Sequence, residues 1–168
     1  MSLPTRPVSG AAIATDWGDE IHDRVLAASG CDVWSSGARS TGTTAIKQNI
    51  DMAHSDPGGY LDAANDQVVI PTGKEGLYLV ILRGQSINGS SGTNNATRAL
   101  LHVNGTNVAS GLEDNQDGVA VSIIVPYLQH FSAGDIVQVW AQRRGSGSNP
   151  DFNVASLQLV RITDDYGA

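Results

Sequence analysis

Three short segments contain residue types that could bind phosphate, attack a carbonyl carbon or hold calcium. The first, Gly37–Thr44 (GARSTGTT), has the glycine spacing of a phosphate-binding loop, but Thr43 stands where that loop needs its lysine. The second, Gly84–Asn88 (GQSIN), begins like the turn that exposes a catalytic serine, but Asn88 replaces the second glycine and a polar loop follows instead of a helix. The first segment lacks the charge that phosphate binding needs and the second lacks the geometry that exposes its serine, so we expect no catalysis from either.

The third segment, Glu113–Gly118 (EDNQDG), alternates acidic and amide residues as a calcium-binding loop does. Its first position is Glu113, however, and Ile124 falls where the bidentate glutamate belongs, so we interpret it as a solvated turn. Metal-ligand spacing is also missing among the four histidines, which are His22, His54, His102 and His130. We therefore predict no catalytic residue, no cofactor and no metal bound by one chain. A metal on an axis shared by several chains stays open.

The composition excludes several other classes of protein. A chain of 168 residues can form one domain with a sizeable core. Its net charge of −7 and its ten Lys and Arg residues, among which Arg143–Arg144 is the closest pair, argue against nucleic-acid binding, which needs clustered cations. A single cysteine, Cys31, excludes an intramolecular disulfide, and we expect a buried structural thiol.

Targeting and membrane segments are not indicated either. The N-terminal stretch Met1–Gly10 lacks the apolar region of a signal peptide. No apolar run approaches the roughly 18 residues of a transmembrane helix. We therefore expect synthesis in the cytoplasm and no membrane insertion.

Residues 1–28 differ in pattern from the rest of the chain. Pro4 and Pro7 restrict the first residues to extended conformations, which is typical of an arm. Apolar residues then recur every four positions and predict one stripe of a short amphipathic helix, formed by Ile13, Trp17, Ile21 and Val25. Such a helix is marginally stable alone, so it must dock on its own domain, on a sister chain or on a larger assembly.

The pattern of residues 29–163 predicts an all-β domain organised around Gly76–Gln85, and residues 164–168 are predicted to be a tail. The segment Gly76–Gln85 is the longest apolar run of the chain. One alternating set of its residues is formed by Leu77, Leu79 and Ile81, and the other by Tyr78, Val80 and Leu82. A strand with one solvated face would alternate apolar and polar residues. We therefore expect a strand covered on both faces, by a sheet on one side and by another sheet or subunit on the other.

Further strands are expected on both sides of this central strand. Turn chemistry separates them, most clearly at Asn104–Gly105, and His54–Gly59 reads as a loop. Pro126 indicates that its strand ends there or lies at a sheet edge. The expected strands lie at Cys31–Ser35, Thr44–Asp51, within Tyr60–Ile70, and at Arg98–Asn104, Thr106–Ala109, Val119–Leu128, Ile136–Gln142 and Phe152–Ile162. About eight to ten antiparallel strands at this spacing predict a β-sandwich.

Short motifs follow one another in a fixed order from Cys31 to Ile162. A Tyr-Asp segment (Tyr60, Asp62) leads to a strand that ends in Pro71, and a Gly-x-Tyr (Gly76, Tyr78) then opens the central strand. An Asn-Gly turn (Asn104, Gly105) with a Val-Ala return (Val108, Ala109) follows, then a Gly-Asp pair (Gly134, Asp135), and a final strand with Phe152 and the small residues Ala155 and Ser156. This order of motifs resembles the TNF-like jelly roll of the complement globular-head family.

The N-terminal stretch PTRPVSGAAIATDWGDEIHDRV resembles the short leader on many structural proteins of tailed bacteriophages. Taken with the missing signal peptide and the absence of collagen-like repeats, it implies a virion structural protein. The leader would then fix the chain to the particle through Pro4, Arg6, Pro7, Ile13, Trp17 and Ile21.

The resemblance to the TNF-like fold implies a homotrimer around a three-fold axis. One face of the central strand would then belong to the core and the other to the axis, which assigns Tyr78, Val80 and Leu82 to the trimer interface. His102 lies opposite the apolar stripe of its own strand, so it is expected to be exposed or at the same interface. Near the axis, protonation would make its copies repel one another.

The preferred hypothesis is a non-enzymatic structural protein on the surface of a virion, made in the host cytoplasm. It would be a capsid decoration or head fibre that contacts capsid proteins, or a minor tail protein that contacts tail proteins and attaches to the host surface. Polar loops on a β scaffold suit a host cell-surface glycan, with candidate residues Asn88, Ser90, Asn94, Asn95, Ser146 and Asn149. The alternative is a free ligand-binding module of the complement-head type, and an enzyme has the least support.

Overall fold

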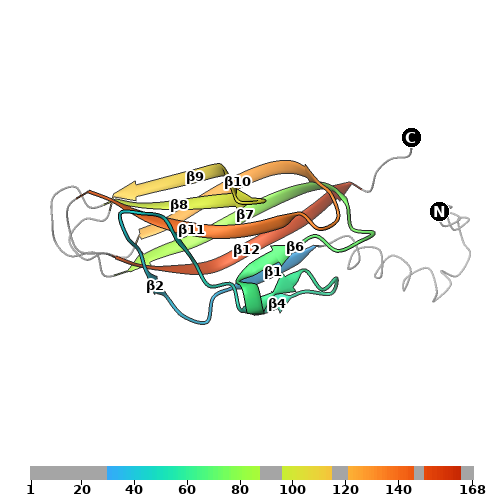
Figure 1. Ribbon diagram of the computed structural model, residues 1–168, viewed down its shortest axis with the longest axis horizontal. Coiled ribbons are helices and arrows are strands. Elements are labelled where there is room, and N and C mark those ends of the chain that lie inside the picture. Colours follow the sequence, from blue (N-terminus) through green and yellow to red (C-terminus); the bar gives the residue numbers. More distant parts are fainter. Residues whose placement is uncertain (1–29, 88–95, 115–120, 146–149, 164–168) are drawn as a thin grey trace, which may run out of the picture.

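Two antiparallel β-sheets pack face to face in the computed structural model, which describes residues 30–87, 96–114, 121–145 and 150–163 (Figure 1). Sheet A has the order β10 (Val121–Phe131), β7 (Gly76–Ile87), β12 (Asp151–Thr163), β1 (Cys31–Trp34) and β4 (Met52–Ser55), and β2 (Arg39–Ser40) pairs with β12. Sheet B has the order β5 (Leu61–Asp62), β6 (Gln67–Val69), β11 (Ile136–Arg144), β8 (Ala96–Val103) and β9 (Thr106–Asp114), and β3 (Ile46–Lys47) pairs with β11. This arrangement confirms the predicted all-β jelly-roll sandwich.

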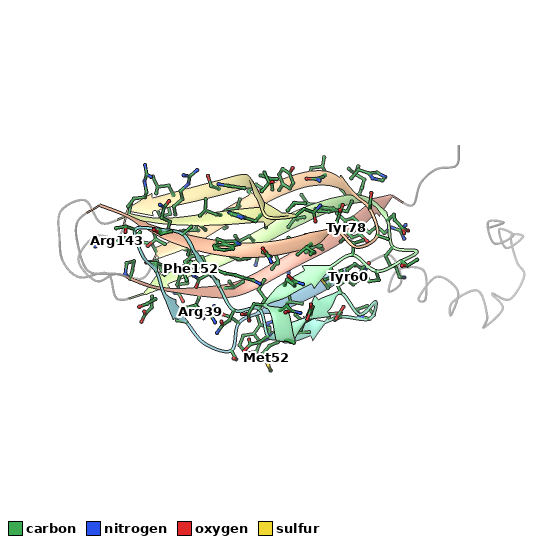
Figure 2. All side chains as sticks on the ribbon, in the orientation of Figure 1. Arg39, Met52, Tyr60, Tyr78, Arg143 and Phe152 are labelled. Atoms are coloured by element: carbon green, nitrogen blue, oxygen red, sulfur yellow. The ribbon has the colours of Figure 1, made fainter. Side chains whose placement is uncertain are left out.

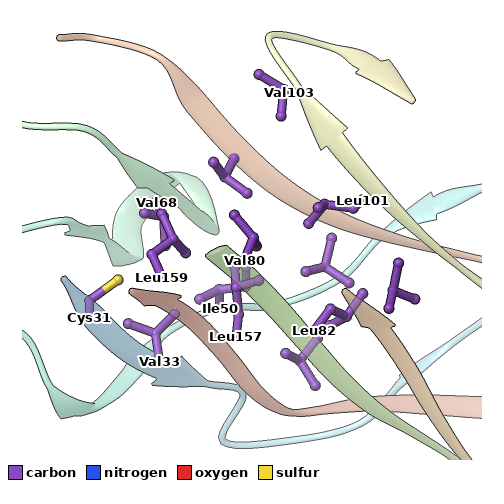
Figure 3. Packing of buried hydrophobic residues seen from close by; sticks show 14 of the residues in the cluster. Cys31, Val33, Ile50, Val68, Val80, Leu82, Leu101, Val103, Leu157 and Leu159 are labelled. Carbon is purple, nitrogen blue, oxygen red and sulfur yellow. The ribbon is translucent and has the colours of Figure 1, made fainter. Parts of the chain in front are cut away.

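The core lies between the two sheets and is built from alternate residues of each long strand. Tyr78, Val80 and Leu82 of β7 have no exposed surface. Figure 3 shows Val80 and Leu82 among the buried side chains that β12 and β8 direct into the same space, including Leu157 and Leu101. The central position of β7 between β10 and β12 explains why Gly76–Gln85 is the most apolar run of the sequence.

Aromatic side chains fill one end of the core. The ring of Tyr78 meets Phe131 edge to face with centroids 5.7 Å apart, and its hydroxyl lies 3.0 Å from that of Tyr60. Figure 2 shows this tyrosine pair at the end of the sandwich opposite Arg143. The Cys31 thiol is buried at the start of β1, and burial raises its pKa. The predicted burial of this thiol is therefore confirmed.

The predicted hairpin turn at Asn104–Gly105 joins β8 to β9. Both residues have positive φ angles, 49° and 77°, as a two-residue turn of this kind requires. The Asn104 side chain also accepts a hydrogen bond from the Ile136 N–H (2.9 Å) and donates one to Asp135 (2.9 Å). The turn is thereby fastened to the start of β11.

Several strand boundaries differ from the predicted ones. Within Thr44–Asp51 only Ile46–Lys47 is a strand, and β4 includes His54, which was predicted to lie in a loop. Strand β9 continues to Asp114 because Ala96 of β8 still pairs with it there, so the segment compared with a calcium loop begins inside a strand. Pro126 lies in the middle of β10 and is tolerated because β10 forms an edge of sheet A, as expected for proline.

Candidate interaction surfaces

The two faces of β7 have the opposite roles from those assigned by sequence. Tyr78, Val80 and Leu82 were predicted at the trimer interface, but their side chains are fully buried in the core of one chain. A side chain without exposed surface cannot contact a second chain, so this assignment is corrected. The outward side of β7 carries Leu77, Leu79 and Ile81 instead, and each of these is only half-buried.

The pairing of strands places further apolar side chains beside these three. Leu79 lies between Leu128 of β10 and Val160 of β12, and Ile81 is paired with Pro126. Directly opposed residues on neighbouring strands have Cβ atoms about 5 Å apart, so their side chains touch. The outward side of sheet A therefore carries a continuous apolar surface, which we name the apolar face and define as Leu77, Leu79, Ile81, Ile124, Pro126, Leu128 and Val160.

The apolar face is strongly exposed for residues of this type. Ile124 is 62% exposed, Leu128 is 56% exposed and Val160 is 41% exposed. Scattered exposed apolar residues are ordinary on protein surfaces, but a contiguous group over three adjacent strands marks an interaction surface. This face can bury apolar area against a partner without rearrangement of the sheet.

The outward side of sheet B is different in chemistry. We name it the tryptophan face and define it as Gln67, Arg98, His102, Gln138, Trp140 and Gln142, all half-buried. Core residues alternate with these along β8 and β11, which fixes their outward direction. The side chains are aromatic, amide or cationic, so this face offers ring surfaces and hydrogen-bonding groups rather than aliphatic area.

His102 belongs to the tryptophan face, and its ring stacks on Trp140 with centroids 5.1 Å apart and planes 20° from parallel. Burial lowers the pKa of His102, although a hydrogen bond with the Gly105 backbone acts in the opposite direction. The structure therefore confirms that His102 points away from the core. It also separates His102 from the apolar face, because the two lie on different sheets, so an interface formed by the apolar face would not include His102.

The predicted anchor and loop residues lie outside the described part of the chain. These are Pro4, Arg6, Pro7, Ile13, Trp17 and Ile21 in the leader, and Asn88, Ser90, Asn94, Asn95, Ser146 and Asn149 in the loops. The strands that flank the loops are described, however. Ile87 pairs with Asp151, Ser86 with Val121 and Ala96 with Arg144, so the strand ends on either side of residues 88–95 and 146–149 lie at one end of the sandwich.

The motifs rejected by sequence occupy structural positions where they are described. Ser86, the serine of the elbow-like segment, lies in β7 with 1% of its surface exposed, and its hydroxyl is 2.7 Å from that of Thr97. Within residues 30–87, 96–114, 121–145 and 150–163, no three His, Cys, Asp or Glu side chains gather as metal ligands would. Over the same residues, no helix is long and apolar enough to cross a membrane.

Comparison with known proteins places the chain by fold alone. No family model and no curated protein matches the sequence. Among solved structures, the globular domain of zebrafish complement 1qA matches with a TM-score of 0.56 and 10% identity, over 80% of this chain and 98% of that one. Murine APRIL at pH 8.0 matches with a TM-score of 0.54 and 15% identity, again over 80% and 98%. This chain therefore has the jelly-roll fold of complement globular-head and TNF-like domains.

Proposed function

We propose that this chain is a non-enzymatic structural protein of a tailed-phage virion that assembles as a homotrimer through the apolar face. The observation that carries the assembly is the exposure of Ile124 and Leu128 on β10 and of Val160 on β12, the two strands that flank β7. The virion role is supported by the likeness of residues 1–28 to phage leaders. In this proposal the leader anchors the trimer to capsid or tail proteins, and the strand-end loops face outward towards a host cell-surface glycan.

A closed assembly covers such a face on every copy, and the fold shared with complement globular-head and TNF-like domains favours three copies in it. In a three-fold ring each subunit offers one surface to the next and receives a different surface from the previous one. All copies then hide their apolar faces around the axis, and no copy is left at an open end. Full burial of one Leu, Ile or Val side chain stabilises by about 1.5–3 kcal/mol, so a few such residues per subunit matter for assembly.

The assembly is tested by light scattering coupled to size-exclusion chromatography. We expect the wild-type chain to have three times the 17.5 kDa mass of one chain. Leu128→Asp should give a folded monomer, because an aspartate in the interface would lose its hydration. Leu112→Asp is the matched control: Leu112 is 55% exposed on sheet B, so its variant should remain trimeric. A monomeric wild-type chain, or a trimeric Leu128→Asp variant, would contradict this interface.

The virion role is tested on purified phage particles. Antibody labelling viewed by electron microscopy should mark the capsid for a decoration or head-fibre protein, and the tail for a minor tail protein. Deletion of residues 1–28 should abolish incorporation into particles while leaving the trimer folded. Absence of the protein from particles by mass spectrometry would reject the virion role.

A second candidate function is a free ligand-binding module that is not attached to a particle. The fold shared with the globular domain of zebrafish complement 1qA, which is aligned over 98% of its length, motivates this candidate. In this case deletion of residues 1–28 should leave ligand binding intact. The same deletion therefore discriminates between the two functions.

A further inference from the structure

Trp140 is a large aromatic residue at the centre of sheet B that keeps part of its surface accessible. It projects outward from β11, between Lys47 of β3 and Leu100 of β8 in the strand register. Leu100 also points outward but is only 4% exposed, so its neighbours on this face cover it. Trp140 therefore has an apolar support on the sheet and stays within reach of a ligand.

The indole ring is held in place from two directions. The His102 ring stacks on the indole with nearly parallel planes. The indole Nε1–H of Trp140 donates to Oε1 of Gln138 at 3.4 Å. Contacts of this kind fix the orientation of a ring before a ligand arrives, which reduces the entropy lost on binding. The ring is thus preorganised as a flat apolar plate.

A row of amide groups continues from this plate across the sheet. Gln138 donates to Oε1 of Gln67 at 3.0 Å, and Gln67 donates to Oδ2 of Asp62 at 2.9 Å. A glutamine amide has two N–H donors and an oxygen with two lone pairs, so each of these groups retains hydrogen-bonding capacity after its contact is made. The row therefore presents oriented, uncharged donors and acceptors beside the aromatic plate.

These two features together match the chemistry of a sugar ring. One side of a pyranose is covered by C–H groups and packs against an aromatic face, while its hydroxyl groups exchange hydrogen bonds with planar amides. Trp140, Gln138 and Gln67 are themselves uncharged, which suits an uncharged sugar, and a net charge of −7 disfavours an anionic one. The aliphatic area that a protein partner would need is concentrated on the apolar face of sheet A instead.

We infer that the tryptophan face binds a neutral hexopyranose or N-acetylhexosamine unit, which stacks on Trp140 and bonds to Gln138 and Gln67. This inference rests on the proposed function for its ligand class, a host glycan, but it places the contact on sheet B rather than in the loops. In the proposed trimer the apolar face of sheet A turns towards the three-fold axis, so the tryptophan face, on the opposite side of the sandwich, turns away from that axis.

The inference is tested by saturation-transfer difference NMR on the full chain. The probes are soluble oligosaccharides of glucose, galactose, mannose, N-acetylglucosamine and N-acetylgalactosamine, and single-site affinities near 1 mM would be detected. We expect wild-type protein to bind at least one probe, Trp140→Ala to lose more than about tenfold in affinity, and Trp140→Phe to retain most of it.

Trp34→Ala is the matched control. Trp34 also stacks on a histidine, His54, with centroids 5.3 Å apart, but it belongs to sheet A. This variant should bind as wild type does. Gln138→Leu keeps Trp140 and its stack with His102 but removes the amide. If this variant also loses binding, the loss in Trp140→Ala cannot be explained by misfolding around a missing tryptophan alone.

Two outcomes would overturn the inference. Wild-type protein that binds none of the probes would reject a saccharide ligand, and folded Trp140→Ala and Gln138→Leu variants with undiminished binding would reject this location. Light scattering on the same samples keeps the result separate from the proposed function. A trimer that binds no sugar overturns only the tryptophan-face site, whereas a sugar-binding monomer overturns only the assembly.

Discussion

Truncation of Phe152 to alanine is expected to lower the free energy of unfolding by about 3–5 kcal/mol. Phe152 is the second residue of the long strand β12 and is 1% exposed, so its loss leaves a cavity in the core between the two sheets. Figure 2 shows it away from the Tyr60–Tyr78 pair, which fills the other end of the sandwich. Neighbouring strands cannot close such a cavity fully, because each is fixed by its own ladder of hydrogen bonds.

The position of Phe152 depends on Gly84 in the adjacent strand β7. A Cβ atom at position 84 would lie 2.0 Å from Cζ of the Phe152 ring, so Gly84→Ala must displace that ring and should cost about 1–3 kcal/mol. Combined with Phe152→Ala, the same substitution fills part of the vacated space. The double variant should therefore lose less stability than the sum of the two single variants.

Urea unfolding of the wild type, the two single variants and the double variant measures the coupling between positions 84 and 152 directly. We expect an interaction free energy of at least about 0.5 kcal/mol between the two sites. Losses that simply add would mean that the ring of Phe152 does not pack against Gly84. A surface substitution such as Leu112→Ala should leave the coupling unchanged, because Leu112 lies outward on sheet B.

The second large effect is expected at Gly30, immediately before β1. Its φ angle is +70°, and an added Cβ atom would lie 1.7 Å from the backbone oxygen of Leu159. Gly30→Ala therefore meets both an unfavourable backbone angle and a collision with the main chain, and should cost at least about 2 kcal/mol. Unlike the contact at Gly84, this collision cannot be relieved by truncating a neighbouring side chain.

Gly37→Ala provides the matched control for Gly30→Ala. An added Cβ atom at Gly37 would meet no atom within 4 Å, so its variant should stay within about 0.5 kcal/mol of wild type. Both variants can be compared by thermal unfolding and by hydrogen exchange of the amides in β1. If Gly30→Ala were as stable as Gly37→Ala, then β1 would not pair with β12 in the register that joins Cys31 to Leu159.

The sequence predicted the layout of the sandwich more reliably than the orientation of its central strand. Alternation within β8 and β11 located two strands, since in each of them an apolar side faces the core and the charged or amide residues lie on the other side. In the first half of β7 both sides are apolar, so the pattern itself cannot say which side faces the core. The second half of β7 contains the missing signal: Arg83 and Gln85 continue the outward set, whereas Gly84 and Ser86 continue the buried one.

The interaction surfaces were harder to find because each joins residues that are distant in the chain. The apolar face depends on Leu79 of β7 lying between Leu128 of β10 and Val160 of β12. No local sequence pattern predicts that these three strands are neighbours. Trp140 and Gln138 are separated by one residue and could have been singled out as an outward pair. Their connection to Gln67 through β6 required the three-dimensional pairing of β6 with β11.

The antiparallel pairing of β7, β8, β11 and β12 has a practical consequence for display of foreign peptides. The strand ends at Ile87, Ala96, Arg144 and Asp151 meet at one end of the sandwich, whereas β1 begins beside Leu159, towards the other end of β12. Leu159 pairs with Val80 of β7, and the seven residue steps from Val80 to Ile87 span about 23 Å. A peptide inserted between residues 87 and 96 would thus be presented tens of ångströms from the point where the chain enters the domain, which makes this scaffold suited to carrying epitopes.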